Sequence, residues 1–341
     1  AQIAPPGIPC PPTGYGASEL VCSNLTEQLV RQGHEVTLFA HEESRTKARL
    51  VSFPSVSRLT DATERELAHA SLAVERADDF DILHNHCITP GPAVIRLASC
   101  PTLTSLHYLR PLIAAFSEEP YVAVSHAQAR SLSHLNVIGV AHNGVNLENL
   151  PLGGHKRDYL LFIGRIDPKK APHLAIQAAR RLDLPLLLAA SYPSEDNIAY
   201  WEEQVKPGLG GKIRYVGEVS AADKGGLIGG ARAVLMPQQW EEPFGLVAAE
   251  AMACGTPVVA MRRGALPEIV PHGVGGFIVD DLDGMVEAVR KIDQIDASDC
   301  RRVVEENFSA EVMTAAYLDL YETLVRQPVP LPLASTEARA S

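Results

Sequence analysis

The sequence predicts an α/β protein of two domains, each built from a parallel β-sheet wrapped by helices. Three observations support this prediction. Short apolar runs alternate with amphipathic segments, the alternation restarts after a polar, Pro/Gly-rich segment at residues 149–158, and 341 residues suffice for two domains of ordinary size. Hydrophobic residues make up 46% of the chain and charged residues 21%, so each domain can bury a substantial core.

The N-terminal domain is expected over residues 1–150. A strand at residues 2–4 leads through a Pro/Gly-rich loop into a helix, in which leucines recur at helical spacing before Gly33 ends it. Further short apolar segments, each bounded by polar or turn residues, are expected as strands at residues 35–40, 81–86, 100–107, 121–125 and 137–144.

The C-terminal domain is expected over residues 156–308, where the same alternation is repeated. Its strands are expected at residues 159–164, 185–191, 212–217, 231–237, 257–261 and 275–279. A last helix at residues 309–326 is expected to pack back toward the N-terminal domain, and the Pro/Ala/Ser-rich tail at 327–341 to be frayed. Two such domains facing each other leave a cleft at the carboxyl ends of both sheets, where ligands bind in these folds.

Net charge, cysteine spacing and hydropathy exclude several classes of function. A formal net charge of −11 disfavours a general affinity for nucleic acid or for an anionic membrane. The six cysteines form no C-x-x-C pair, so we expect buried free thiols in a reducing cytoplasm instead of disulfides or a metal site. No run of eighteen apolar residues and no leader pattern occurs, so we expect a cytoplasmic protein without membrane association.

The most informative stretch joins a predicted strand to a predicted helix that begins near Gly245. Phe244, Gly245 and Leu246 would present free backbone N–H groups at a helix N-terminus, which is a ready site for an anion. Glu242 precedes this helix and Glu250 lies within it, so a regular helix would separate the two carboxylates by roughly 10 Å. That separation suits two hydroxyl-bearing parts of one ligand better than a paired acid and base.

Two further segments carry residues suited to a diphosphate. A predicted strand ends at Gly164, and Arg165 and Lys170 follow on the loop, where two cations beside a strand end form a diphosphate clamp. Gly16 opens the first helix directly after the first strand, which is again a phosphate-type loop. This loop is not an intact G-x-G-x-x-G, because Glu19 stands where the third glycine would be.

Together these segments resemble the retaining nucleotide-sugar glycosyltransferases of the GT-B fold, specifically glycosyltransferase family 4. The segment EPFGLVAAEAMACGTPVVA at residues 242–260 is similar to that family's Glu-x7-Glu motif, and GRIDPKK at 164–170 to its Gly-Arg…Lys segment. GYGASE at 14–19 resembles its N-terminal Gly-rich loop, and RRGALPEIV at 262–270 its Gly-Gly-x-x-Glu loop. The resemblance covers nearly the whole chain and implies two Rossmann-like, doubly wound domains.

The resemblance implies a role for each residue on the donor side. Glu250 would hold the ribose hydroxyls, and Arg165 and Lys170, with Gly164 beside them, would bind and neutralise the diphosphate. The backbone N–H groups of Phe244, Gly245 and Leu246 would contact the phosphate and the donor sugar.

The remaining implied roles concern the reacting sugar. Glu242 would contact the sugar hydroxyls, and Gly16 would approach the diphosphate from the N-terminal domain. His107 would lie beside the anomeric carbon and offer its backbone carbonyl to the developing positive charge. The chain departs from the family pattern at Ala171 and Ala265, which replace glycines; we expect Ala265 to lie where the donor sugar sits.

The resemblance therefore implies a transferase that moves a sugar from a nucleoside diphosphate, UDP being favoured, to a small-molecule or glycan acceptor. We expect no metal or other cofactor, because Arg165, Lys170 and helix N-termini can stabilise the leaving diphosphate. The resemblance assigns no protein nucleophile. The alternative is that Glu242 acts as a covalent nucleophile.

Three other functions fit the sequence less well. A non-catalytic nucleotide-sugar binding protein of the same fold would be expected to have lost Glu242, Arg165 or Lys170, and all three are present. An NAD-linked oxidoreductase would be expected to keep an intact dinucleotide fingerprint, which GYGASE is not. His84 and His86 share one strand face and could bind zinc, but no third ligand is evident in the sequence.

Overall fold

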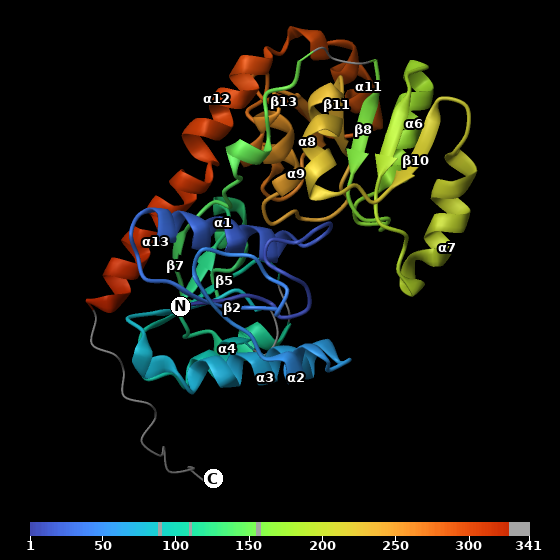
Figure 1. Cartoon of the computed structure of the whole chain (residues 1–341). Helices are drawn as coiled ribbons and strands as arrows, with labels where there is room; N and C mark the ends of the chain where they lie inside the picture. The colour runs from blue at the N-terminus through green and yellow to red at the C-terminus, as the bar shows by residue number, and fades with distance from the viewer. Residues whose placement is uncertain (88–90, 109–110, 155–157, 327–341) are drawn as a thin grey trace, which may run out of the picture.

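The computed structural model describes residues 1–87, 91–108, 111–154 and 158–326, which form two α/β domains, one above the other in Figure 1. The N-terminal sheet has seven parallel strands in the order β3-β2-β1-β4-β5-β6-β7. These strands are β1 (Gln2–Ile3), β2 (Thr37–Phe39), β3 (Arg49–Val51), β4 (Leu83–Asn85), β5 (Thr102–Ser105), β6 (Tyr121–Ala123) and β7 (Val137–Val140). Its helices are α1 (Ala17–Arg31), α2 (Pro54–Ser57), α3 (Ala62–Val74), α4 (Gly91–Ile95) and α5 (His126–Ser131).

The C-terminal sheet has six parallel strands in the order β10-β9-β8-β11-β12-β13. They are β8 (Leu160–Ile163), β9 (Leu186–Ala189), β10 (Ile213–Gly217), β11 (Ala233–Met236), β12 (Val258–Met261) and β13 (Gly276–Val279). The helices are α6 (Pro172–Leu182), α7 (Ile198–Tyr200), α8 (Ala221–Gly230), α9 (Leu246–Ala253), α10 (Leu266–Ile269), α11 (Leu282–Arg290), α12 (Ala297–Asn307) and α13 (Ala310–Val325).

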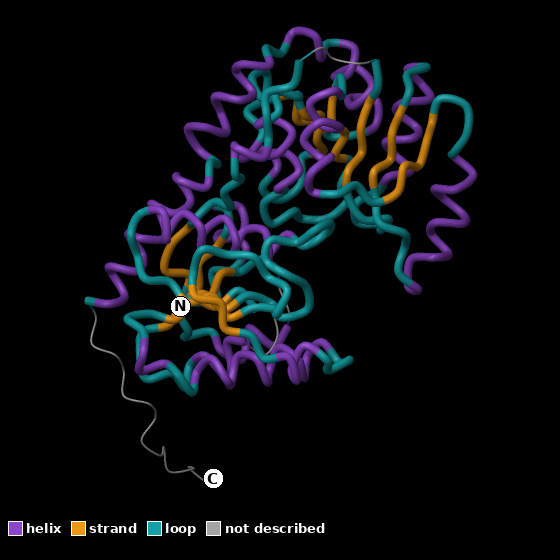
Figure 2. Tube along the Cα trace, in the orientation of Figure 1, coloured by secondary structure: helices purple, strands orange, loops and turns teal. Residues whose placement is uncertain are grey.

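The predicted fold class, two doubly wound α/β domains, is the one observed. In both sheets the strand order reverses direction next to the first strand of the domain, which is the point where ligands bind in open α/β sheets. The loops that follow the strands gather where the two domains face each other (Figure 2). The edge strand β3 and helix α3 were not anticipated, because their residues lack a clear periodicity.

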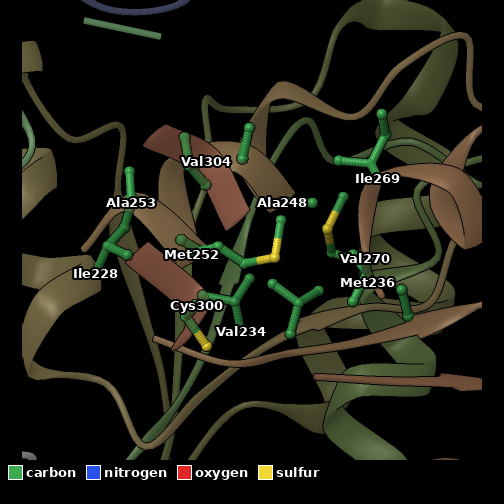
Figure 3. Close-up of a cluster of buried hydrophobic side chains, with 14 of the residues drawn as sticks. Ile228, Val234, Met236, Ala248, Met252, Ala253, Ile269, Val270, Cys300 and Val304 are labelled. Carbon is green, nitrogen blue, oxygen red and sulfur yellow. The ribbon is translucent and has the colours of Figure 1, made fainter. Parts of the chain in front are cut away.

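Helix α9 is almost wholly apolar, with the sequence LVAAEAMA, and it is buried between the C-terminal sheet and α12. Figure 3 shows the cluster around it, in which Ala248 and Met252 of α9 lie among Val234, Ile269 and Val304. A helix that is apolar nearly all round is fixed firmly in a core. The fold therefore holds the first turn of α9, and the loop before it, in one position.

The last two helices connect the domains along one side of the molecule (Figure 1). Helix α12 packs on α9 in the C-terminal domain, and α13 packs on α1 and β7 in the N-terminal domain. The side chain of Ser309 caps α13, accepting from the N–H of Val312 at 3.2 Å, and Gly144 passes so close that a Cβ there would lie 2.6 Å from the Ser309 carbonyl oxygen. Buried Tyr317 and Tyr321 join α13 to the first domain's core.

All six cysteines are buried, and none of them forms a disulfide. Among the helices of the described residues, none combines the length and the hydrophobicity that crossing a bilayer requires.

Candidate active site in the cleft between the domains

A cleft of about 500 Å³ lies between the two domains, at the carboxyl ends of both sheets. All residues to which the sequence analysis gave a catalytic or donor-binding role line this cleft: Gly16, His107, Gly164, Arg165, Lys170, Glu242, Phe244, Gly245, Leu246 and Glu250. Segments more than two hundred residues apart in sequence are thus brought into one cavity.

Lys170 and Glu242 form a buried ion pair in the cleft. The Lys170 Nζ lies 2.5 Å from Glu242 Oε2, with the two side chains 20% and 9% exposed. The same carboxylate oxygen accepts from Trp240 Nε1 at 3.0 Å and from Gln238 Nε2 at 3.4 Å. A lysine ammonium has three donors, so two remain for an anionic ligand after the bond to Glu242.

Arg165 lies on the loop after β8, beside the N-terminal domain. Its Nη2 is 3.2 Å from Asp167 Oδ2, and its guanidinium carbon lies 5.9 Å from the centre of the Tyr15 ring. Arg165 Nε is buried and has no hydrogen-bond partner in the described part of the chain. A buried donor without a partner is costly, so it is a donor that a bound ligand can satisfy.

The N-terminus of α9 is open toward the cleft. Gly245 adopts a φ of 94°, and a Cβ at this position would lie 2.9 Å from Leu266 Cδ2, so the loop requires glycine here. No acceptor is found for the N–H groups of Phe244, Gly245 or Leu246 within the described residues. Unpaired N–H groups and the positive end of the helix dipole favour an anion at this point.

The loop at Gly264 and Ala265 supports Glu242 from behind. The N–H of Ala265 donates to the Glu242 carbonyl oxygen at 2.8 Å, and a Cβ at Gly264 would lie 2.3 Å from the Glu242 backbone. Ala265 is fully buried and is not among the residues that line the cleft. The expectation that Ala265 lies where the donor sugar sits is therefore wrong: this position packs behind Glu242, and its methyl group points into the core.

The glycine-rich loop of the N-terminal domain contacts the C-terminal domain directly. The N–H of Tyr15 donates to Glu218 Oε1 at 2.7 Å, and the N–H of Ala221 donates to the Thr13 carbonyl oxygen at 3.0 Å. Gly16 has a φ of 153°, and a Cβ there would lie 2.5 Å from Ile8 Cδ1. The loop therefore closes one end of the cleft by contacts that only a compact backbone permits.

Comparison with protein families agrees with this geometry. The family model described as Glycosyltransferase Family 4 matches residues 18–149, and the model described as Glycosyl transferases group 1 matches residues 152–307. The chain belongs to glycosyltransferase family 4. The two matches together cover both domains of this family 4 glycosyltransferase.

Known proteins similar to the chain fall in the same group. D-inositol 3-phosphate glycosyltransferase from Mycobacterium sp. (strain KMS) is 35% identical over 161 residues, which are 43% of this chain and 36% of that relative. The chain thus matches little more than a third of that relative's length.

Solved structures match the fold over nearly the whole chain. Sucrose-phosphate synthase from Thermosynechococcus elongatus has a TM-score of 0.79 at 20% identity, covering 95% of this chain and 98% of that one. HepE from Anabaena, in complex with UDP and glucose, has a TM-score of 0.76 at 18% identity, covering 95% and 99%. A glycosyltransferase involved in avilamycin A biosynthesis has a TM-score of 0.74 at 23% identity, covering 96% and 98%. At these identities the similarity establishes the GT-B fold.

A chain of buried hydrogen bonds reaches His107 of this family 4 glycosyltransferase from the N-terminal core. His107 Nε2 lies 2.8 Å from His86 Nδ1, and His86 Nε2 lies 2.9 Å from Gln2 Oε1. Gln2 Nε2 donates to the Tyr321 hydroxyl at 3.0 Å, and that hydroxyl lies 2.6 Å from His84 Nδ1. His84 Nε2 lies 2.7 Å from Ser105 Oγ, so His84 and His86 each have protein partners on both ring nitrogens, which accounts for them without zinc.

The hydrogen bonds also determine the tautomer of His107. Burial lowers the pKa of His86 well below its usual value and that of His107 to about 4, so both rings are neutral near pH 7. Because an amide oxygen only accepts, His86 carries its proton on Nε2 and accepts at Nδ1. His107 consequently donates from Nε2, and its ring adds no positive charge to the cleft.

Several cleft residues escaped the sequence analysis. Lys224 Nζ donates to Glu250 Oε1, and Trp240 and Gln238 bind Glu242; none of these three lies in a recognisable motif. Glu19, which the sequence analysis noted only as the residue in place of a third glycine, also lines the cleft, and burial raises the pKa of its carboxyl to about 7. A polar residue inside an apolar stretch was the one available signal for such positions.

A second contact between the domains lies outside the cleft. Glu268 of α10 accepts from His142 Nε2 at 2.5 Å, and from the backbone N–H groups of His126 and Ala127 at 2.9 and 3.0 Å. Partial burial acts to raise the pKa of Glu268, but these hydrogen bonds outweigh it and lower the pKa to about 2. The same three side chains, His126, His142 and Glu268, are close enough to hold a metal ion.

Two Asp-x-Asp segments occur in the chain, at residues 79–81 and 281–283. Such segments bind metal-nucleotide complexes when they face a donor site. Neither segment lines the cleft, and their aspartates are exposed. They therefore offer no ligand to a metal at the candidate active site.

Proposed function

We propose that the chain is a retaining, metal-independent glycosyltransferase. It moves a sugar from a nucleoside diphosphate, with UDP favoured, to a hydroxyl group of a small-molecule or glycan acceptor. One observation supports this above the others: a single cleft brings together Arg165 and Lys170, the open N-terminus of α9 and the separate carboxylates of Glu242 and Glu250. That combination matches a ligand with a diphosphate at its centre and hydroxyl groups at both ends.

The leaving diphosphate is stabilised by groups that need no metal. Breaking a sugar–phosphate bond places additional negative charge on the departing oxygen. Lys170 retains two donors, Arg165 has its unpaired Nε, and α9 contributes free N–H groups. These groups are already fixed by Glu242, Asp167 and the core, so little reorganisation is required during the reaction.

The two carboxylates bind the hydroxyl groups at either end of the donor. Glu242, held by Lys170 and Trp240, contacts the transferred sugar, and Glu250 contacts the ribose. His107 lies on the facing wall, where its backbone carbonyl supports the positive charge that develops at the anomeric carbon. The acceptor attacks on the same face, and the leaving phosphate takes its proton, so no protein nucleophile is required.

UDP is favoured as the donor nucleotide because a protein of the same fold binds it. HepE from Anabaena, which shares the fold, has been solved in complex with UDP and with UDP-glucose.

The alternative function is that of a non-catalytic nucleotide-sugar binding protein of the same fold, which would bind the donor without turning it over.

Release of nucleoside diphosphate from a panel of donors tests the proposal. UDP-, GDP-, ADP- and TDP-sugars are incubated with the protein and candidate acceptors, with EDTA and with Mg²⁺. We expect nucleoside diphosphate to be released from one donor class at a rate that EDTA does not change. In Arg165→Ala the rate of release should fall by at least about 10²-fold, the scale for one transition-state contact. Binding without release from any donor would favour the non-catalytic alternative, and release only with Mg²⁺ would contradict metal independence.

A further inference from the structure

Lys224 and Glu250 form a buried ion pair on the wall of the cleft. Lys224 belongs to α8 and Glu250 to α9, and their side chains are 22% and 5% exposed. Lys224 Nζ donates to Glu250 Oε1, and both residues line the cleft. Glu250 is the charged residue within the apolar helix α9, so its partner determines how its carboxylate is oriented.

The pair is poorly explained as a device for stability alone. Desolvating two charges costs about as much as their attraction returns, and apolar residues of similar volume generally serve as well. Helices α8 and α9 already pack through apolar contacts, with Ile228 in the same buried cluster as Ala253 (Figure 3). An ion pair between them therefore calls for a function in the cleft.

The pair also has hydrogen-bonding capacity that the protein does not use. Among the described residues, Lys224 Nζ donates one of the three hydrogen bonds that an ammonium group can donate, and Glu250 Oε2 accepts none. An acceptor oxygen beside an ammonium donor complements a vicinal diol, whose hydroxyls both donate and accept. A ribose offers that diol at its 2′ and 3′ positions, whereas a deoxyribose lacks half of it.

We propose that Lys224 is a specificity residue that makes the site select ribonucleoside diphosphates over their 2′-deoxy counterparts. Lys224 orients Glu250 so that Oε2 accepts from one ribose hydroxyl, and its own ammonium donates to the neighbouring ribose oxygen. This rests on the proposed function, in which Glu250 faces the ribose. It disfavours TDP-sugars as donors, because their sugar is a deoxyribose, and a site built to bind a hydroxyl discriminates against the analogue without it.

Calorimetric titration with UDP and with 2′-deoxy-UDP, both in EDTA, tests the proposal. We expect wild type to bind 2′-deoxy-UDP about 10- to 100-fold more weakly than UDP, the range for hydrogen bonds to charged groups. In Lys224→Met the ratio of the two dissociation constants falls to about threefold or less, because UDP loses affinity and 2′-deoxy-UDP loses little. Lys224→Arg, which keeps the charge, retains part of the discrimination.

Two further variants serve as controls for this titration. Lys212→Met removes an exposed lysine paired with Asp183 outside the cleft, and it keeps the wild-type ratio. If Lys224→Met does not fold, Lys224→Met with Glu250→Gln removes both charges, and the same collapse of the ratio is expected. A wild type that binds UDP and 2′-deoxy-UDP equally, or a Lys224 variant that keeps the ratio, overturns this inference alone. A wild type that binds no nucleoside diphosphate overturns the proposed function as well.

Discussion

Replacing Lys170 with methionine would separate two effects of the ion pair with Glu242, one on stability and one on turnover. Methionine keeps most of the apolar stem and removes the ammonium, so Glu242 remains buried at 9% exposure without its cation. Breaking a buried pair by removing one partner costs about 3–5 kcal/mol. Because Trp240 and Gln238 still donate to the carboxylate, we expect the lower end of this range, about 3 kcal/mol, or a melting temperature lower by about 5–10 °C.

Turnover should fall by more than stability explains. Lys170 has two donors left, which the proposed function assigns to the leaving diphosphate, and losing one such transition-state contact typically costs 10²–10³ in kcat. The double variant Lys170→Met, Glu242→Gln leaves no buried charge unpaired, so its melting temperature recovers toward wild type while its kcat stays low. Assays are run at a temperature where circular dichroism shows every variant to be folded.

Lys169→Met is the matched control for this series. Lys169 is the exposed neighbour of Lys170, its Nζ lies 5.8 Å from the centre of the Trp240 ring, and it does not line the cleft. We expect its kcat to stay within threefold of wild type. A folded Lys170→Met protein with wild-type kcat would refute the assignment of Lys170 to the leaving group.

Four further predictions concern single residues. Ala171 has a φ of 50°, so Ala171→Gly should stabilise the protein by up to about 1 kcal/mol in thermal unfolding, and no gain would show that the position is unstrained. Gly245→Ala should weaken nucleoside diphosphate binding about tenfold by calorimetry, because its Cβ would meet Leu266 and turn the free N–H groups away; unchanged affinity would place the anion elsewhere. Glu268→Gln should cost about 1–2 kcal/mol at pH 7. Since the folded pKa of Glu268 is depressed to about 2, its contribution is present above about pH 4.5 and is lost as the pH falls toward 2, so variant and wild type should converge in acid unfolding; a constant difference would contradict this. His107 should show no ring titration by NMR between pH 8 and 5, given its pKa of about 4, and a midpoint above 6 would contradict its burial.

The sequence predicted the cleft because its residues lie in contiguous motifs. Gly245 follows a strand and opens a helix, and Arg165 and Lys170 follow another strand, so local patterns place all three at the carboxyl edge of one sheet. The two-domain architecture was predictable for the same reason, since alternating strands and helices produce it without knowledge of long-range contacts.

The parts that escaped prediction depend on packing between distant segments. Lys224 lies in a glycine-rich helix of weak amphipathicity, and its pairing with Glu250 follows only from how α8 packs on α9. Glu268 was part of a motif, but its partner His142 belongs to the other domain. Ala265 was misplaced because a family motif gives the neighbourhood of a residue without the direction of its side chain.

Thermal unfolding with a panel of nucleotides tests the central claim most directly. UDP, GDP, ADP, TDP and NAD are each added with EDTA and with Mg²⁺, and a ligand that binds only the folded state stabilises it by RT ln(1 + [L]/Kd). We predict a rise in melting temperature with one nucleoside diphosphate, UDP foremost, that persists in EDTA and disappears in Arg165→Ala. A rise with NAD alone, or with none of the diphosphates, would contradict a nucleotide-sugar site in this cleft.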